Sequence, residues 1–424
     1  MTAPHVRWIR RPADGAGARV IHVNTSARGG GVAEIVENVT RHDIARGRRS
    51  GWAVIDAPDE FFAFTKGLHH LFHGRGDPHL LAAGGATYRQ VLDRVPALLE
   101  ADIRADDIVV LHDPQTLGLA RWAAGRARRV YWHCHIGSLQ DPDGVKGALW
   151  DFFADDLSAV DAVLVTEPGY LVGATVARVR IVRPAIDPEA PKNATMSDDE
   201  VARCLRPFGA VAADGAVVPG GRVWQDVPLP EHAPMVLQVS RWDPLKGMAD
   251  VLRSTAELEP RTHVVLAGPD PAEVLDDPEG IAQLRATLQQ VRALPAPVRR
   301  RVHVIALSSH DRELNALCVN ALQRRADVVV QRSLEEGFGL TVTEAMFKGR
   351  PVVASHTGGI PRQIDHGVSG LLVHPGDDRA FVTAVNELLA DEQMRMDIGA
   401  AAESSVRGHY LIDRLATDYD LLRH

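Results

Sequence analysis

Short runs of valine, isoleucine and leucine alternate with longer helical patterns along almost the whole chain. Runs of this kind are typical of parallel strands that helices cover on both faces. The runs form two sets, one at 19–24, 107–112, 130–134, 162–166 and 179–183, and one at 235–240, 263–267, 302–307, 327–330, 351–354 and 370–373. Helical patterns separate them, for example at 33–46, 150–158, 311–324 and 379–391. The alternation predicts an α/β fold with two Rossmann-like, doubly wound domains.

The segment 187–232 separates the two sets. The chain has 424 residues, and a single core rarely serves more than about 250–300 residues. The segment is rich in proline, glycine, aspartate and alanine, which predicts a linker with a short helix over 197–205. We therefore expect domains at 1–186 and 187–405, followed by an amphipathic helix near the C-terminus. Ligands of such folds bind beyond the carboxyl ends of the strands, so we expect the active site in a cleft between the domains.

Composition excludes several classes of function. With 47 basic and 55 acidic side chains the net charge is −8, so no basic field attracts nucleic acid or an anionic membrane. The three cysteines, Cys134, Cys204 and Cys318, are too few and too far apart for a disulfide framework or a cysteine zinc site. No apolar run reaches the roughly 20 residues of a membrane span, and residues 1–19 lack the apolar core of a secretory signal. We expect a cytoplasmic enzyme.

The stretch 333–349 reads S-L-E-E-G-F-G-L-T-V-T-E-A-M-F-K-G and follows a predicted strand. Its glycines, Gly337 and Gly339, allow a ligand to approach the main chain. The helix expected from about residue 340 presents unpaired N–H groups that suit a phosphate. Glu336 precedes this helix, and Glu344 lies about one turn into it, where it can bind a ribose. A glycine-rich turn with two surface glutamates is the alternative.

The spacing of Glu336 and Glu344 excludes one kind of chemistry. Eight residues of helix separate two carboxylates by roughly 12 Å. Glycosidases need their two carboxylates about 5 to 9.5 Å apart. The two glutamates therefore fit two parts of one long ligand, such as a sugar nucleotide.

A second motif, S-R-W-D-P-L-K-G at 240–247, also follows a predicted strand. Arg241 and Lys246 would lie at the carboxyl end of that strand, where an arginine fork and a lysine charge suit a diphosphate leaving group. Structural ion pairing is the alternative, and Arg241 can pair with Glu336 in an empty site.

The N-terminal half offers two further groups of residues near its strands. The glycine run that includes Gly30 and Gly31 lets backbone N–H groups approach a phosphate or a sugar hydroxyl, or is only a tight turn. His133 and His135 share a face of their strand, yet the sequence shows no third ligand nearby, so we expect no metal site. His135 can bind a sugar or have a structural role. No Asp-x-Asp motif follows a strand to hold a divalent cation on a diphosphate.

These motifs resemble the retaining GT-B glycosyltransferases of family 4. The resemblance rests on the E-G-F-G-L-T-V-T-E and S-R-W-D-P-L-K-G segments and the N-terminal glycine run, and it covers most of the chain. Within that family the chain is most similar to the trehalose glycosyltransferring synthases, in the stretches H-V-N-T-S-A-R-G-G-G-V-A-E-I, L-H-D-P-Q, C-H-I, A-I-D-P and the C-terminal tail. The resemblance implies a GT-B fold with two Rossmann-like domains that face each other across a cleft. It also implies a terminal helix, 406–424, that crosses back to the N-terminal domain.

The resemblance further implies roles for single residues. In the donor domain, Arg241 and Lys246 would clamp the diphosphate, Glu336 would bind the donor sugar, Gly337, Phe338, Gly339 and Leu340 would contact phosphates and sugar, and Glu344 would bind the ribose. In the acceptor domain, His135 would lie beside the donor sugar, Gly30 and Gly31 near the diphosphate, and Asp113 and Gln115 at the acceptor. The mechanism implied is metal-independent transfer with retention, without a protein nucleophile or cofactor.

The loop after His135 departs from this resemblance. The synthases continue after C-H-I with an aspartate, whereas this chain continues with G-S-L-Q-D-P at 137–142. The partners expected are a nucleoside-diphosphate sugar and a small polar acceptor, with a homodimer as a further expectation. The acceptor is glucose if the chain acts as a trehalose synthase. An N, O or S acceptor of secondary metabolism, and a sugar-nucleotide-binding protein or epimerase without transferase activity, are the alternatives.

Overall fold

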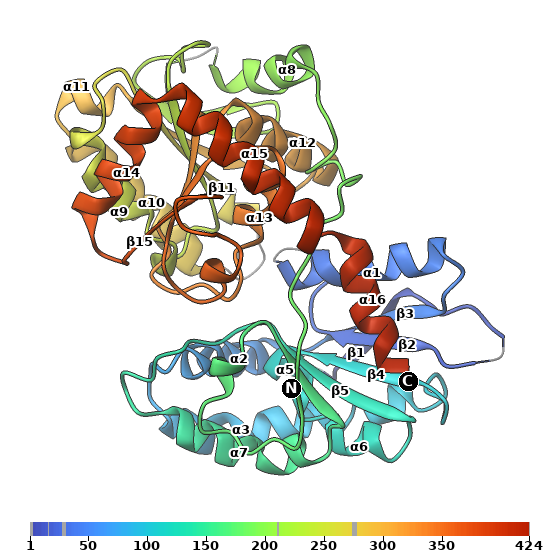
Figure 1. Cartoon of the computed structure of the whole chain (residues 1–424). Coiled ribbons are helices and arrows are strands. Elements are labelled where there is room, and N and C mark those ends of the chain that lie inside the picture. Colours follow the sequence, from blue (N-terminus) through green and yellow to red (C-terminus); the bar gives the residue numbers. More distant parts are fainter. Residues whose placement is uncertain (1–2, 16, 28–30, 210–211, 274–277, 424) are drawn as a thin grey trace. The chain divides into compact units, whose positions relative to one another are not determined.

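The computed structural model describes residues 3–15, 17–27, 31–209, 212–273 and 278–423. The chain divides into two compact units, which we call unit 1 (Met1–Ala185 with Ile412–His424) and unit 2 (Ile186–Leu411). Each unit holds one α/β sheet with helices on both faces (Figure 1). The predicted doubly wound α/β fold is confirmed. No helix among the described residues has both the length and the apolar character needed to cross a membrane.

Unit 1 is built on a seven-stranded sheet of order β1-β3-β2-β4-β5-β6-β7, parallel except for β1. Its strands are β1 (His5–Arg10), β2 (Val20–Asn24), β3 (Ser50–Asp56), β4 (Ile108–His112), β5 (Arg129–Cys134), β6 (Ala162–Val165) and β7 (Val179–Ile181). Its α-helices are α1 (Gly31–Ala45), α2 (Asp59–Phe72), α3 (His79–Leu92), α4 (Pro96–Leu99), α5 (Asp113–Leu117), α6 (Ala120–Ala124), α7 (Lys146–Ser158) and α16 (Ile412–Asp420).

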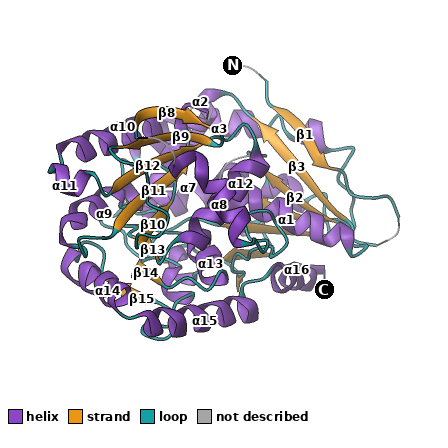
Figure 2. Cartoon of the chain, turned by 90° about the horizontal axis from the view of Figure 1, so that it is seen from above, coloured by secondary structure: helices purple, strands orange, loops and turns teal. Residues whose placement is uncertain are grey.

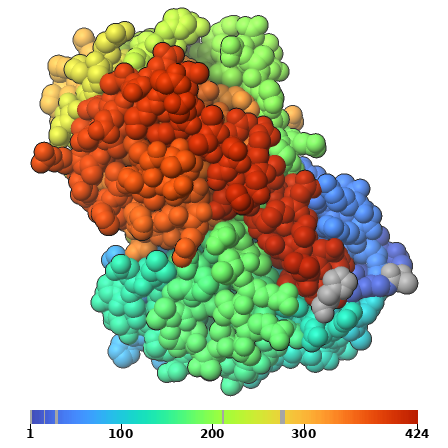
Figure 3. Space-filling model, in the orientation of Figure 1, coloured from blue at the N-terminus to red at the C-terminus, as the bar shows by residue number. Residues whose placement is uncertain are grey.

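Side chains alternate between the two faces of this sheet because successive residues of a strand point in opposite directions. Ala53 and Ile55 of β3 enter the larger core, formed mainly with α2, α3 and α7. Trp52 and Val54 point to the other face, where they pack with α1. The C-terminal helix α16 lies against α1 on that second face (Figure 3). Asp413 of α16 pairs there with Arg46 at 2.6 Å.

Unit 2 is built on an eight-stranded sheet of order β15-β14-β13-β10-β11-β12-β9-β8, which can be followed in Figure 2. Its strands are β8 (Ala213–Val218), β9 (Gly221–Gln225), β10 (Met235–Val239), β11 (His263–Pro269), β12 (Val302–Leu307), β13 (Val328–Gln331), β14 (Val352–Ser355) and β15 (Leu371–Val373). Its α-helices are α8 (Asp198–Gly209), α9 (Met248–Ser254), α10 (Pro278–Ala293), α11 (Ala296–Arg299), α12 (Arg312–Arg325), α13 (Leu340–Phe347), α14 (Asp378–Ala390) and α15 (Glu392–His409).

Two expectations about the chain's organisation are wrong. The short helix predicted over 197–205 is present as α8, but the rest of the segment 187–232 is more than a linker. It contains the β8–β9 hairpin, whose turn includes Gly220, and β9 pairs antiparallel with β12 to extend the sheet of unit 2. The terminal helix expected over 406–424 is interrupted, because α15 ends at His409 and α16 begins at Ile412. The interruption falls where the chain passes from unit 2 back to unit 1.

Candidate active site

The best-organised polar site of unit 2 lies where β10 and β13 end. These strands are parallel neighbours, so the loops that follow their carboxyl ends lie side by side. The Nζ of Lys246 donates to both carboxylate oxygens of Glu336 at 2.9 Å. Ser333 donates from Oγ to the same carboxylate at 3.0 Å. Both ends of the ion pair are mostly buried, which strengthens their attraction.

Backbone contacts fix the two loops to each other. The N–H of Leu334 donates to the carbonyl of Leu245 at 2.7 Å. Gln238, buried inside β10, donates to the carbonyl of Lys246 at 2.6 Å and accepts from the N–H of Arg332 at 3.2 Å. These contacts of Leu334, Gln238 and Arg332 thus fix the backbone from which the Lys246 side chain extends.

Helix α13 begins directly after the Glu336 loop. Gly339 caps it with φ of 87°, a conformation that favours glycine. Gln363 connects this loop to α13. Its Nε2 donates to the carbonyl of Phe338, and its Oε1 accepts from the hydroxyl of Thr343 at 2.6 Å. The amino end of α13 therefore follows the loop of Glu336 directly, and the amino end of a helix is suited to hold an anion.

Glu344 of α13, which was predicted to bind the ribose, is almost completely buried. Its Oε1 lies 3.3 Å from the Nζ of Lys192, which comes from the segment before α8. Arg241 is exposed, and its guanidinium lies 3.6 Å from Asp243. The pair of Arg241 with Glu336, considered above as an alternative, is replaced by Arg241 with Asp243 and by Lys246 with Glu336.

In unit 1 the strands β4 and β5 end beside each other and carry a second polar group. His112 and His133 are register partners on these strands, and His135 follows at the end of β5. The Nδ1 of His112 lies 2.9 Å from the Nε2 of His135. The expectation that no third ligand lies near His133 and His135 is wrong, because ring nitrogens of all three histidines lie within 4.8 Å of one another.

Asp113, the first residue of α5, has φ of 61°, the one positive value of a non-glycine residue in the part of the chain that the structure describes. Such a conformation is costly and recurs at functional sites. The carboxylate accepts the N–H of His135 at 2.9 Å. Burial raises the pKa of this carboxyl to about 7, although the hydrogen bond from His135 acts in the opposite direction.

Two family models and several relatives match this sequence. Residues 22–172 match the family described as trehalose synthase, N-terminal domain, and residues 224–405 match the glycosyl transferases group 1. A trehalose synthase of Rubrobacter xylanophilus is 34% identical over 408 residues, which cover 95% of this chain and 89% of the relative. The chain belongs to the trehalose synthase family. It is accordingly a glycosyltransferase.

Further matches support membership of the trehalose synthase family and its fold. The trehalose synthase of Pyrococcus horikoshii is 33% identical, with 94% of this chain and 88% of the relative covered. A sucrose-phosphate synthase from Thermosynechococcus elongatus superposes with a TM-score of 0.69 at 18% identity, over 95% of this chain and 98% of that one. An α,α-trehalose-phosphate synthase from Burkholderia xenovorans gives 0.71 at 15% identity, over 96% and 100%. The two-sheet architecture is that of the GT-B fold.

For this member of the trehalose synthase family, the structure brings Lys246, Glu336 and the start of α13 together in unit 2 and His135 and Asp113 together in unit 1. Gln115 lies in α5, where its buried Oε1 has no hydrogen-bond partner among the described residues. Gly31 is the first residue of α1. Gly30 lies outside the described residues.

Several supporting residues of the site were missed in the sequence, namely Gln238, Ser333, Gln363 and Lys192. A signal for Gln238 existed, because it is a polar residue inside an otherwise apolar strand. Such a residue must find internal partners when it is buried. The others lie outside the helices and strands of the sheet, and Gln363 and Lys192 depend on contacts far along the chain, so the sequence gives no comparable sign.

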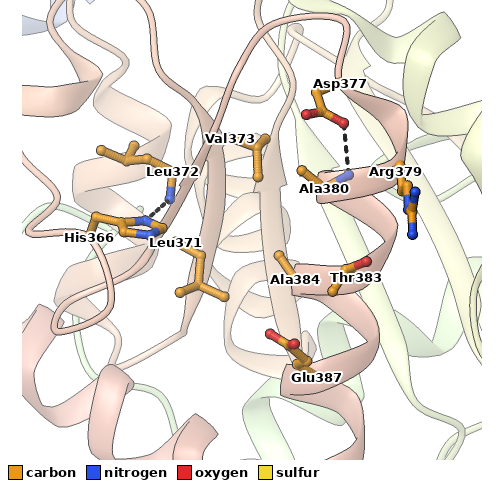
Figure 4. Close-up of a pocket in the computed structure, with 10 residues that line it drawn as sticks. All are labelled: His366, Leu371, Leu372, Val373, Asp377, Arg379, Ala380, Thr383, Ala384 and Glu387. Atoms are coloured by element: carbon orange, nitrogen blue, oxygen red, sulfur yellow. Dashed lines mark hydrogen bonds between the residues drawn. The ribbon is translucent and has the colours of Figure 1, made fainter.

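A cavity of about 430 Å³ lies elsewhere in unit 2, between the edge strand β15 and helix α14 (Figure 4). Its polar groups already serve the local structure. His366 accepts the N–H of Leu372 at 2.9 Å, and Asp377 caps α14 by accepting the N–H of Ala380 at 2.9 Å. Because none of the candidate donor-binding residues lines this cavity, we place the site at the loops of β10 and β13.

Gly247→Ala should destabilise the protein by about 1–3 kcal/mol and lower transfer. Gly247 has φ of 66°, and a Cβ there would lie 2.0 Å from the carbonyl oxygen of Arg332. The two loops would have to separate, which moves Lys246. Gly408→Ala in helix α15 is the control, because nothing lies within 4 Å of its Cβ position. Denaturant unfolding that ranks the two variants equally would contradict this prediction.

Asp113→Asn should stabilise the protein at pH 8 and leave it unchanged at pH 4. The folded pKa of Asp113 is about 7, above the unfolded value of about 3.9. The stability tied to its protonated form is therefore complete below about pH 4 and is lost as the pH rises through about 7. Asparagine stays neutral, accepts the same hydrogen bond and tolerates a positive φ.

The difference in unfolding temperature between wild type and Asp113→Asn, measured at a series of pH values, tests this prediction. The contributions of all other titrating groups cancel in that difference. Asp113→Ala serves as the control, since it loses the hydrogen bond from His135 and should be less stable at every pH. Parallel pH profiles for wild type and the asparagine variant would show that the pKa is not raised.

Proposed function

We propose that this chain is a retaining, metal-independent hexosyltransferase that moves a hexose from a nucleoside-diphosphate sugar to glucose and so forms trehalose. The observation that carries the proposal is the buried Lys246–Glu336 pair beside the amino end of α13. All three groups lie at one sheet edge. The cation Lys246 would contact the diphosphate, the Glu336 carboxylate would contact hydroxyls of the sugar, and the amino end of α13 would contact phosphate oxygens. The name of the relatives, trehalose synthase, supports the choice of acceptor.

Unit 2 is proposed as the donor domain. Lys246 and Arg241 bind the diphosphate, and Glu336 binds hydroxyls of the donor sugar. The backbone from Gly337 to Leu340, including Phe338 and Gly339, contacts the phosphates. Glu344 binds the ribose, and in the structure its carboxylate pairs with Lys192 at 3.3 Å.

Unit 1 is proposed as the acceptor domain. His135 contacts the donor sugar, and Asp113 and Gln115 bind the acceptor. The strained backbone of Asp113 supports its role, because strain of this kind is retained where it positions a side chain. Gly30 and Gly31 are proposed to contact the diphosphate.

The reaction proposed needs no protein nucleophile. The bond from C1 of the sugar to the diphosphate oxygen breaks, and the acceptor oxygen bonds to C1 on the same face. The acceptor proton passes to the departing diphosphate, whose growing negative charge Lys246 and Arg241 stabilise. The protein contributes orientation and fixed charges, both of which the cross-linked loops of β10 and β13 provide.

Incubation with ADP-, GDP- and UDP-glucose together with isotopically labelled glucose tests the proposal. We expect one of these donors to give labelled α,α-trehalose, with the α configuration of the donor sugar retained in its NMR spectrum. Donor turnover without trehalose would exclude glucose as the acceptor. A β linkage in the product would exclude retention.

A further inference from the structure

Four buried histidines lie on one face of the unit 1 sheet. They are His22 of β2, His112 of β4, His133 of β5, and His135 directly after β5. These three strands are parallel neighbours, and the alternation of side chains places the four rings on the face that α1 and α16 cover. The His133 and His135 ring centroids are 3.8 Å apart, and those of His112 and His135 are 5.2 Å apart. The glycosyl transfer proposed above uses only His135.

Outer partners hold two of these rings by one nitrogen each. The Nδ1 of His133 lies 2.6 Å from the hydroxyl of Tyr419 on α16. The Nε2 of His112 lies 2.9 Å from the Nδ1 of His22. The other nitrogen of each ring is thereby directed back toward the cluster. The Nε2 of His133 is buried there without a hydrogen-bond partner among the described residues.

The spacing of the inner nitrogens suits a metal ion. Zinc–nitrogen bonds of about 2.1 Å in a tetrahedral arrangement hold the ligand nitrogens about 3.4 Å apart. The Nδ1 of His112 and the Nε2 of His135 are 2.9 Å apart, and the ligand atoms of all three rings lie within 4.8 Å of one another. Small shifts of the rings thus bring three nitrogens to coordination distance.

We propose that His112, His133 and His135 form a binding site for a zinc ion, with His22 and Tyr419 as the outer partners that orient two of the ligands. His112 binds through Nδ1, and His133 and His135 bind through Nε2. Three neutral imidazoles leave the fourth tetrahedral position to a water molecule or a small anion. Outer hydrogen bonds of this kind set the tautomer and the orientation of ligating histidines.

Zinc binding leaves the number of protons on the three histidines unchanged. Histidine binds zinc as a neutral imidazole, which keeps one N–H on the nitrogen that does not face the ion. His112 then carries its proton on Nε2 and donates it to His22. His133 donates from Nδ1 to Tyr419, and His135 keeps its proton on Nδ1. Zinc therefore binds with a change of tautomers and without net release of protons from the histidines.

Metal content and spectroscopy of the full chain test the site. The chelator-treated protein is incubated with ZnCl₂ or CoCl₂ and dialysed. We expect one ion per chain, a tetrahedral Co²⁺ absorption spectrum, and a higher unfolding temperature with zinc, because an ion that binds only the folded state stabilises it. His133→Gln should lose all three signals. Tyr419→Phe keeps every ligand and should weaken zinc affinity by about 10- to 100-fold.

His303→Gln is the matched control. His303 is buried in unit 2 and lies 2.8 Å from the half-buried His263, and the two belong to no group of three possible ligands among the described residues. This variant should bind zinc as the wild type does. Absence of stoichiometric zinc in the wild type, or equal binding by wild type and a folded His133→Gln, would overturn the proposal.

One further test of the metal site, inhibition of glycosyl transfer by zinc, rests on the proposed function. A bound ion withdraws His135 from the donor sugar, so transfer should fall in proportion to zinc uptake and recover with a chelator. Zinc binding without this inhibition would leave the metal site standing and would refute the role given to His135.

Discussion

Replacement of Lys246 by methionine should lower kcat/KM for glycosyl transfer by about 10²- to 10³-fold, the loss typical of one preorganised group that stabilises developing charge. Lys246 Nζ lies 2.9 Å from both oxygens of Glu336 and is mostly buried. A charge held in such surroundings acts strongly on a diphosphate and needs no reorganisation during the reaction. Methionine keeps the length of the side chain and removes only the charge and the three N–H donors.

The same substitution distinguishes binding from catalysis. If Lys246 stabilises the departing diphosphate, kcat should fall more than the affinity for the free nucleoside diphosphate, which titration calorimetry measures. Lys66→Met, at an exposed position of α2, is the control and should keep wild-type transfer. The circular dichroism spectrum should be unchanged in both variants. Near-normal transfer by the Lys246 variant would show that the clamp lies elsewhere.

The central strands could be predicted from the sequence because burial leaves a direct pattern. A strand covered on both faces is mostly apolar, as in Ile108–His112 and Val302–Leu307, and the runs predicted at these places are strands. The strands that were missed include the edge strands β1 and β8, whose exposed or half-buried residues give a weak apolar signal. The interior strand β3 was missed as well, although it is buried; it begins with Ser50 and Gly51, which interrupt the apolar run.

The candidate site was predictable in part for a related reason. The positions of Lys246 and Glu336 after strands indicated a shared sheet edge, but not that these two side chains pair. That pairing depends on the adjacency of β10 and β13, which are far apart in the chain. The histidine cluster depends on the register of three strands and on Tyr419, which lies 286 residues after His133. No local pattern encodes such contacts.

Glu336→Gln should lower kcat/KM by about 10²-fold while the affinity for the free nucleoside diphosphate stays close to that of the wild type. The Glu336 carboxylate accepts hydrogen bonds from Lys246 and Ser333. When a diphosphate draws Lys246 away, the carboxylate becomes the acceptor for hydroxyls of the donor sugar. Glutamine preserves the shape and weakens those bonds, since charge-assisted hydrogen bonds are about twice as strong as neutral ones.

Glu335→Gln is the matched control, because this neighbouring glutamate is buried to a similar degree in the same loop. It should retain most of the transfer activity. The double variant Lys246→Met with Glu336→Gln decides whether Glu336 acts on the donor or only on Lys246. If Glu336 merely holds Lys246 in place, the double variant is no slower than Lys246→Met alone. If it binds the donor sugar as proposed, the double variant loses a further factor of about 10 or more, because a separate contact is removed.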